Sequence, residues 1–256
     1  EASFKILEVF GDDYYYWKLF DTAKILNEAS EKGEGESLLN SKASSLTFYE
    51  KGAWALSMLR EEIGDSAFKE GIKKYLNKYQ YQNATVADFI AVMEKVSGKD
   101  LNEFKGVWLE GKDFPKEIAK DFLIKKSSSV RMFYVWKHDR EKTFTSKETL
   151  EDSELSIELK LELLKLKNDF IGMQLWPIIV NDDIKIRQFA AKKMDIIPEE
   201  LREFAEPLLL DDRYITNELM LYNLWTSFDY DRSVFLDKTK DIIGLPNKNV
   251  RLLWLT

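Results

Sequence analysis

The chain has 256 residues, with 38 basic and 45 acidic side chains and a formal net charge of −7. That length is enough to bury a large core, either as one elongated domain or as two. The acidic balance argues against nucleic-acid binding, which needs a basic face, and no run approaches the ~18 apolar residues of a membrane span. The absence of cysteine excludes disulfides and fits the cytosol and the periplasm equally.

The composition favours an all-α architecture, because only 11 glycines and 5 prolines interrupt the chain and the alternation typical of strands is rare. Residues 2–29 are predicted to form one or two helices, with a break at Gly11–Asp13. We interpret the aromatic run 14–17 as helix packing in preference to ligand stacking. Residues 31–36 are predicted to form a polar loop.

A helix with a tyrosine in its first turn is predicted next. Thr47 is followed three residues later by Glu50, which is the pattern of a capping box. The apolar stripe of this helix consists of Gly52, Ala53, Leu56, Leu59 and Ile63. Gly64 is the expected stop. The phenol of Tyr49 would face outward near the positive end of the helix, where it could donate a hydrogen bond to a developing oxyanion. The alternative is an ordinary, partly buried helix tyrosine.

An ordered series of marks follows this helix. The series consists of Gly64-Asp65, Phe68, Gly71, Tyr75-Leu76, Tyr79, Asn83-Ala84-Thr85, Asp88-Phe89, Met93-Glu94, Ser97-Gly98-Lys99-Asp100-Leu101, Phe104, Trp108-Leu109 and Pro115. No single mark is specific, but the ordered set resembles the end of the catalytic domain of the M1 family of zinc metalloaminopeptidases, which are gluzincins. The resemblance extends roughly from Phe10 to Pro115. It implies that residues 1–115 are the C-terminal helical part of such a catalytic domain.

The resemblance implies a catalytic role for one residue. In the M1 family, the tyrosine that precedes an acidic residue, a lysine and a glycine donates a hydrogen bond to the oxyanion of the tetrahedral intermediate. Tyr49 holds that position in Tyr49-Glu50-Lys51-Gly52. The His-Glu-x-x-His helix of the family, and the Gly-x-Met-Glu-Asn strand that holds the substrate's amino group, have no counterpart in this sequence. The chain therefore resembles a C-terminal fragment that lacks the zinc-binding segment.

Zinc is expected in the full-length parent, with no metal or other cofactor bound by residues of this chain. A catalytic zinc site of this kind needs two histidines and a carboxylate, and His138 is the single histidine. Glu1 is set aside as a zinc ligand, because its spacing to Tyr49 is short for that role. His138 stands beside Asp139, and we interpret this pair as a solvated turn in preference to an acid–base pair.

The second half of the chain, residues 116–256, is predicted to be a HEAT/armadillo-like α-helical domain. Asp152, Asp182 and Asp211 are each expected to open a helix, and their spacing of roughly 30 residues is that of a helix pair. The architecture resembles the C-terminal domain of M1 enzymes, which closes one side of the substrate cavity. No residue-level motif supports this likeness, and helical arrays also serve as protein-binding surfaces.

Three arginines in this half, Arg187, Arg213 and Arg251, could meet a substrate carboxylate, but we interpret each as a surface residue. The leading hypothesis is the C-terminal portion of a zinc-dependent aminopeptidase that acts on peptides. Its partner would be the upstream half of its own parent, and it would be inactive alone. The chain does not start with methionine, so it is expected to begin inside a longer protein or after processing. The alternative is a degenerate peptidase or a non-catalytic scaffold that binds a protein partner.

Overall fold

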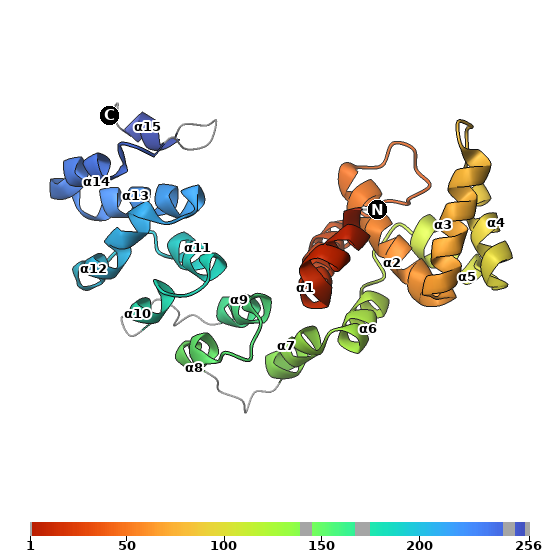
Figure 1. Cartoon of the computed structure of the whole chain (residues 1–256), viewed down its shortest axis with the longest axis horizontal. Helices are drawn as coiled ribbons and strands as arrows, with labels where there is room; N and C mark the ends of the chain where they lie inside the picture. Colours follow the sequence, from red (N-terminus) through yellow and green to blue (C-terminus); the bar gives the residue numbers. More distant parts are fainter. Residues whose placement is uncertain (1, 139–144, 167–174, 243–248, 254–256) are drawn as a thin grey trace. The chain divides into compact units, whose positions relative to one another are not determined.

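All regular elements that the structure describes are helices, which confirms the predicted all-α class. The computed structural model (Figure 1) describes residues 2–138, 145–166, 175–242 and 249–253. Within these ranges no helix is long and apolar enough to cross a membrane.

The chain divides into two compact units, Glu1–Arg131 and Met132–Thr256. The division falls within helix α7 (Ser128–His138). The assignment of residues 1–115 to a peptidase domain and of residues 116–256 to a helical array concerns ancestry as well as shape, and it stays a prediction.

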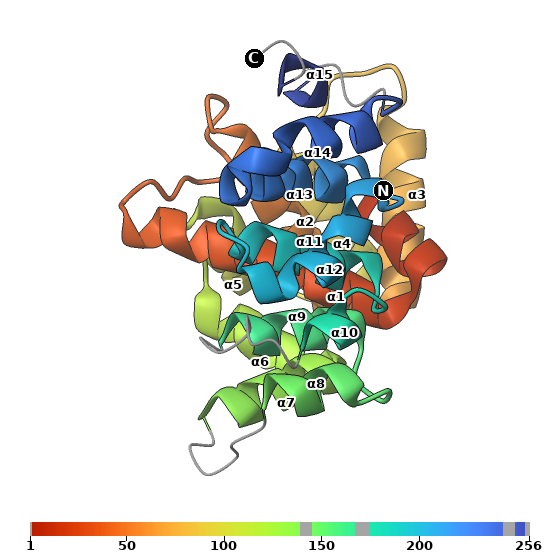
Figure 2. The same cartoon turned by 90° about the vertical axis from the view of Figure 1, so that its left-hand side faces the viewer.

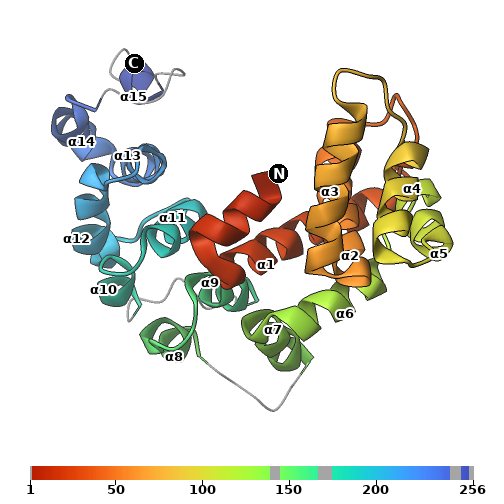
Figure 3. The same cartoon turned by 45° about the vertical axis from the view of Figure 1, so that its right-hand side comes forward.

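The first unit is built mainly from the helices that precede α7. They are α1 (Ala2–Glu31), η1 (Leu46–Lys51), α2 (Gly52–Ile63), α3 (Asp65–Tyr79), α4 (Val86–Ser97), α5 (Asn102–Phe104), η2 (Lys105–Glu110) and α6 (Lys116–Lys126). Gly11, with φ 82°, kinks α1 at the predicted break, and Gly64, with φ 85°, ends α2 at the predicted stop. Helices α3 and α4 then pack side by side (Figures 1 and 3).

Trp54 of α2 lies in the aromatic core of the first unit and is fully buried. Its indole Nε1 donates a hydrogen bond to Thr22 Oγ1 of α1 at 3.1 Å. The ring of Trp108 stacks on it, with the centroids 6.2 Å apart. Phe114 and Phe122 meet it edge-on, with centroid distances of 5.5 and 5.9 Å. One side chain therefore joins α1, α2, η2 and α6, because each of them contributes a group that contacts it.

The aromatic run of α1 also packs into this unit. Tyr15 and Trp17 are buried. The Tyr15 hydroxyl hydrogen-bonds Ser57 Oγ at 2.8 Å, and Trp17 Nε1 donates to Ser129 Oγ at 2.8 Å. The interpretation of this run as helix packing is confirmed for these two residues.

The second unit consists of shorter helices. They are α8 (Ser146–Glu151), α9 (Ile157–Lys165), α10 (Trp176–Ile179), α11 (Ile184–Lys193), η3 (Glu199–Leu201), α12 (Arg202–Ala205), η4 (Glu206–Leu210), α13 (Tyr214–Ser227), η5 (Asp229–Asp231), α14 (Arg232–Thr239) and α15 (Asn249–Leu253). Figure 2 shows α11, α13 and α14 in succession, and α13 packs against both of the others.

The predicted aspartate marks of this unit have different outcomes. Asp183 caps α11, because its carboxylate accepts the Lys185 N–H at 2.8 Å, and Asp211 lies in the turn before α13. The expectation that Asp152 opens a helix is wrong: Asp152 ends α8, and Ser156 supplies the N-cap of α9. A serine closer to the apolar stripe of α9 therefore takes the capping role. The finer HEAT/armadillo assignment stays a prediction.

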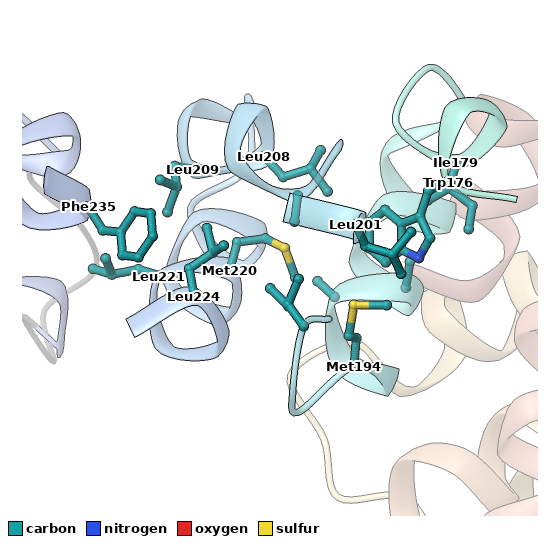
Figure 4. Packing of buried hydrophobic residues seen from close by; sticks show 14 of the residues in the cluster. Trp176, Ile179, Met194, Leu201, Leu208, Leu209, Met220, Leu221, Leu224 and Phe235 are labelled. Atoms are coloured by element: carbon teal, nitrogen blue, oxygen red, sulfur yellow. The ribbon is translucent and has the colours of Figure 1, made fainter. Parts of the chain in front are cut away.

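One apolar core holds the second unit together (Figure 4). Its buried members include Trp176, Ile179, Met194, Leu201, Leu208, Leu209, Met220, Leu221, Leu224 and Phe235. These side chains come from successive helices between α10 and α14. Each helix is therefore held by its neighbours in the chain, as in stacked helical arrays.

Candidate functional site

Tyr49 lies in η1, a π-helical segment that continues directly into α2. The capping box predicted from Thr47 and Glu50 is wrong, because the helix begins at Leu46, before Thr47, and the Thr47 N–H donates to Ser44 Oγ at 3.4 Å. Thr47 lies inside the helix, where its buried hydroxyl donates to the carboxylate of Glu36 at 3.2 Å. Single π-helical turns of this kind are frequent at functional sites.

The side chain of Tyr49 is 75% exposed, so it is not a packing residue of the first unit. Its hydroxyl has no hydrogen-bond partner in the part of the chain that the structure describes. An exposed phenol on a short helical segment is available to donate one hydrogen bond to a group outside this chain. The catalytic role of Tyr49 stays a prediction, and this geometry is compatible with it.

The side chain of Lys51, two residues after Tyr49, is buried and not exposed. Only 2% of it is exposed. Its ammonium Nζ donates to the backbone carbonyls of Glu36, Gly111 and Lys112 at 2.7, 2.7 and 2.8 Å. A lysine ammonium has three donors, so all three are used. We call this arrangement the Lys51 clamp.

The clamp joins the loop before η1 to the turn after η2. Two further hydrogen bonds connect the same loop to η2 itself: Ser37 Oγ donates to the Leu109 carbonyl at 2.8 Å, and the Leu38 N–H donates to the same oxygen at 3.0 Å. Gly35 lies so close to this turn that a Cβ there would stand 2.9 Å from the Lys112 carbonyl oxygen. The loop is therefore held in one position by several independent contacts.

Charge around the clamp is partly compensated. Burial lowers the pKa of Lys51, while the carboxylates of Asp113 and Glu36 act in the opposite direction. The pKa of the Glu36 carboxyl is itself lowered, first by hydrogen bonds from the backbone and side chain of Ser44 and further by the Thr47 hydroxyl and the Lys51 ammonium. Glu36 thus stabilises the loop through two groups, because both its backbone carbonyl and its carboxylate accept hydrogen bonds.

The lowered pKa of Glu36 gives a pH-dependent prediction. Its carboxylate stabilises the fold above the pKa of the unfolded chain, and this contribution is lost as the pH falls through the lower, folded pKa. The thermal midpoint of the wild-type chain should therefore exceed that of Glu36→Gln at neutral pH, with the difference shrinking from about pH 6 to about pH 3. Glu34→Gln, at an exposed carboxylate of the same loop, is the control. A difference that grows towards acid pH would contradict this role.

Among the other residues singled out in the sequence, the structure describes the side chains of His138, Arg187 and Arg213. His138 is exposed at the end of α7, and Asp139 and Glu1 lie outside the described residues. Arg187 is not a surface residue: its guanidinium contacts the buried carboxylate of Asp211 and donates to the Asp182 carbonyl.

Arg213 is exposed, and the side chain of Arg251 lies outside the described set. Across the described ranges, no group of three or more histidine, aspartate or glutamate side chains could hold a metal ion.

Sequence reasoning missed Lys51 and Glu36 as residues that build the site. A signal for Lys51 was present, because Lys51, Ala55 and Leu59 recur at the four-residue spacing of one helix face. A cation on an apolar face needs buried acceptors. No local signal pointed to Glu36, since its partners lie 8 and 11 residues away.

Residues 36–108 match the family model described as the peptidase family M1 domain. They form part of an M1 peptidase domain. The predicted resemblance to this family is thereby confirmed. This M1 segment, as we call residues 36–108, begins at the clamp residue Glu36, contains Tyr49 and Lys51, and ends at Trp108 of the aromatic core.

Curated relatives of the chain bear aminopeptidase names. The chain is 35% identical over 104 residues to aminopeptidase N of Lactococcus lactis subsp. lactis, an alignment that covers 40% of this chain and 12% of the relative. It is 34% identical over 135 residues to probable aminopeptidase 2 of Sulfurisphaera tokodaii, covering 53% and 17%.

A longer alignment links the chain to aminopeptidase N of Escherichia coli strain K12, with 24% identity over 194 residues, or 73% of this chain and 22% of the relative. In each of these three alignments the chain spans less than a quarter of the relative's length. No solved structure matches the chain.

Proposed function

We propose that the chain is the C-terminal portion of a zinc-dependent M1 aminopeptidase that removes N-terminal residues from peptides. Tyr49 contributes the hydrogen-bond donor that stabilises the oxyanion of the tetrahedral intermediate. The observation that supports this role is the side chain of Tyr49 itself, which is exposed and lies within the M1 segment. A packing tyrosine would be buried or bonded within its own unit.

The chemistry asked of Tyr49 is specific. Attack on a peptide carbonyl places negative charge on the carbonyl oxygen, and a fixed donor aimed at that oxygen stabilises the transition state more than the ground state. The donor must be held in place before the reaction, because reorganising it would cost part of the gain. Tyr49 stands on a helical segment whose inner face is fixed by the Lys51 clamp.

The residues of this chain do not fit the family's zinc. A two-histidine site cannot be built from a chain that has only one histidine and no cysteine. We therefore assign the metal and its ligands to the upstream half of the parent. The second unit, as a HEAT/armadillo-like array, would close one side of the substrate cavity.

The isolated chain separates this function from the scaffold alternative when it is compared with the intact parent. The 256-residue chain should bind no stoichiometric zinc in metal analysis and should not hydrolyse an aminoacyl fluorogenic substrate, whereas the parent should do both. Hydrolysis by the isolated chain together with bound zinc would contradict the division of labour proposed here. A parent that neither binds zinc nor hydrolyses the substrate would favour the degenerate peptidase or scaffold.

A further inference from the structure

Oxyanion stabilisation by Tyr49 does not by itself explain why the ammonium of Lys51 is buried. Burying an ammonium is costly unless its donors are satisfied. Here all three N–H donors of the ammonium bond backbone carbonyls, those of Glu36, Gly111 and Lys112, and none bonds a carboxylate. Backbone acceptors fix the course of two chain segments. The clamp is therefore suited to holding loops in position.

The clamp and the phenol lie on opposite faces of one short helical segment. Residues two apart in a helical segment lie on roughly opposite sides of its axis, and the exposures of 2% for Lys51 and 75% for Tyr49 agree with this arrangement. Because three hydrogen bonds hold the Lys51 ammonium on the buried side of η1, both the rotation and the translation of η1 are limited. Tyr49 is carried by the same segment, so its direction is limited too.

We propose that Lys51 is a positioning residue for Tyr49: its ammonium fixes η1 against the preceding loop and the turn at residues 111–112, and so holds the phenol in its productive direction. This proposal rests on the proposed function of Tyr49. Lys51 does not touch the substrate. Its effect on the reaction passes through the position of the tyrosine hydroxyl, and a misplacement of about 1 Å can cost on the order of 100-fold in rate.

The first arm of the test measures the clamp without catalysis. Lys51→Met in the 256-residue chain removes the three donors and keeps a long apolar side chain. Amide hydrogen exchange should rise at Leu38 and Ser44, whose N–H groups donate to the Leu109 carbonyl and to the Glu36 carboxylate. Lys42→Met, at an exposed lysine of the same loop, is the matched control and should leave both amides unchanged. Unchanged exchange in a folded Lys51→Met chain would overturn the clamp.

The second arm measures whether Lys51 acts through Tyr49. In the intact parent, Lys51→Met should lower kcat about 10- to 100-fold, and the same change in a Tyr49→Phe background should lower it little further. Equal losses in both backgrounds would overturn the positioning role. If Tyr49→Phe leaves kcat unchanged, the proposed function fails and the positioning role fails with it, while the exchange arm still decides whether Lys51 holds the loop.

A second variant covers the case in which Lys51→Met does not fold. Ser37→Ala removes a separate tie between the loop and the Leu109 carbonyl and leaves the buried ammonium in place. It should raise exchange at Leu38 and lower kcat in the wild-type background only. Faster exchange with an unchanged kcat would show that the position of the loop does not matter to Tyr49, which would overturn the proposal.

Discussion

Replacing Tyr49 by phenylalanine in the intact parent enzyme should lower kcat by about 10²–10³-fold, with little change in KM. The substitution removes one hydroxyl and keeps the ring. Because that hydroxyl is proposed to bond the oxyanion, its loss weakens the transition state and leaves the ground state nearly untouched. Steady-state kinetics on a peptide-like substrate measure both constants.

A matched control is available in the same unit. Tyr81 is 97% exposed and stands outside any helix, so Tyr81→Phe should leave kcat and KM unchanged. An unchanged kcat in Tyr49→Phe would remove Tyr49 from the mechanism. A raised KM with a normal kcat would assign it to substrate binding instead.

Replacing Trp54 by alanine should destabilise the first unit by about 3–5 kcal/mol, which is the usual cost of truncating a large buried aromatic side chain. Trp54 is 0% exposed, and its loss leaves the rings of Trp108, Phe114 and Phe122 around a void. The Thr22 hydroxyl also loses the hydrogen bond that it accepts from the Trp54 indole. Domain stabilities of about 5–15 kcal/mol make this a large fraction of the total.

Calorimetric unfolding tests this prediction, because two compact units can unfold in separate transitions. The transition of the first unit should move to lower temperature while that of the second stays in place. Leu76→Ala, at a leucine of α3 that is 61% exposed, is the control and should change little. An unaltered first transition in Trp54→Ala would mean that the aromatic core contributes less than its burial indicates.

Much of the helical fold could be predicted from the sequence, because its breaks rest on local chemistry. Gly11 and Gly64 adopt positive φ where the helices were expected to break or stop, which is the conformation that glycine adopts at least cost. The errors arise where a distant group or a second candidate competes. Thr47 had the local pattern of a cap, but its hydroxyl bonds Glu36, 11 residues away. Ser156, and not Asp152, supplies the N-cap of α9.

The residues of the candidate site also differ in whether they could be predicted from the sequence. Tyr49 was found through a resemblance carried by neighbouring residues, and the match of residues 36–108 supports that resemblance. Lys51 was overlooked, although the sequence places this cation at the four-residue helical spacing of Ala55 and Leu59. Arg187 contacts the carboxylate of Asp211, 24 residues away, and the spacing of residues in the sequence does not reveal such a tertiary contact.

The affinity of the parent enzyme for a tetrahedral transition-state analogue tests most directly whether Tyr49 binds the oxyanion. Tyr49→Phe should weaken binding of the analogue by about the factor lost in kcat/KM, roughly 10²–10³, while a planar substrate-like inhibitor binds as before. Equal affinity of wild type and Tyr49→Phe for the tetrahedral analogue would contradict the assignment of Tyr49 as the oxyanion donor.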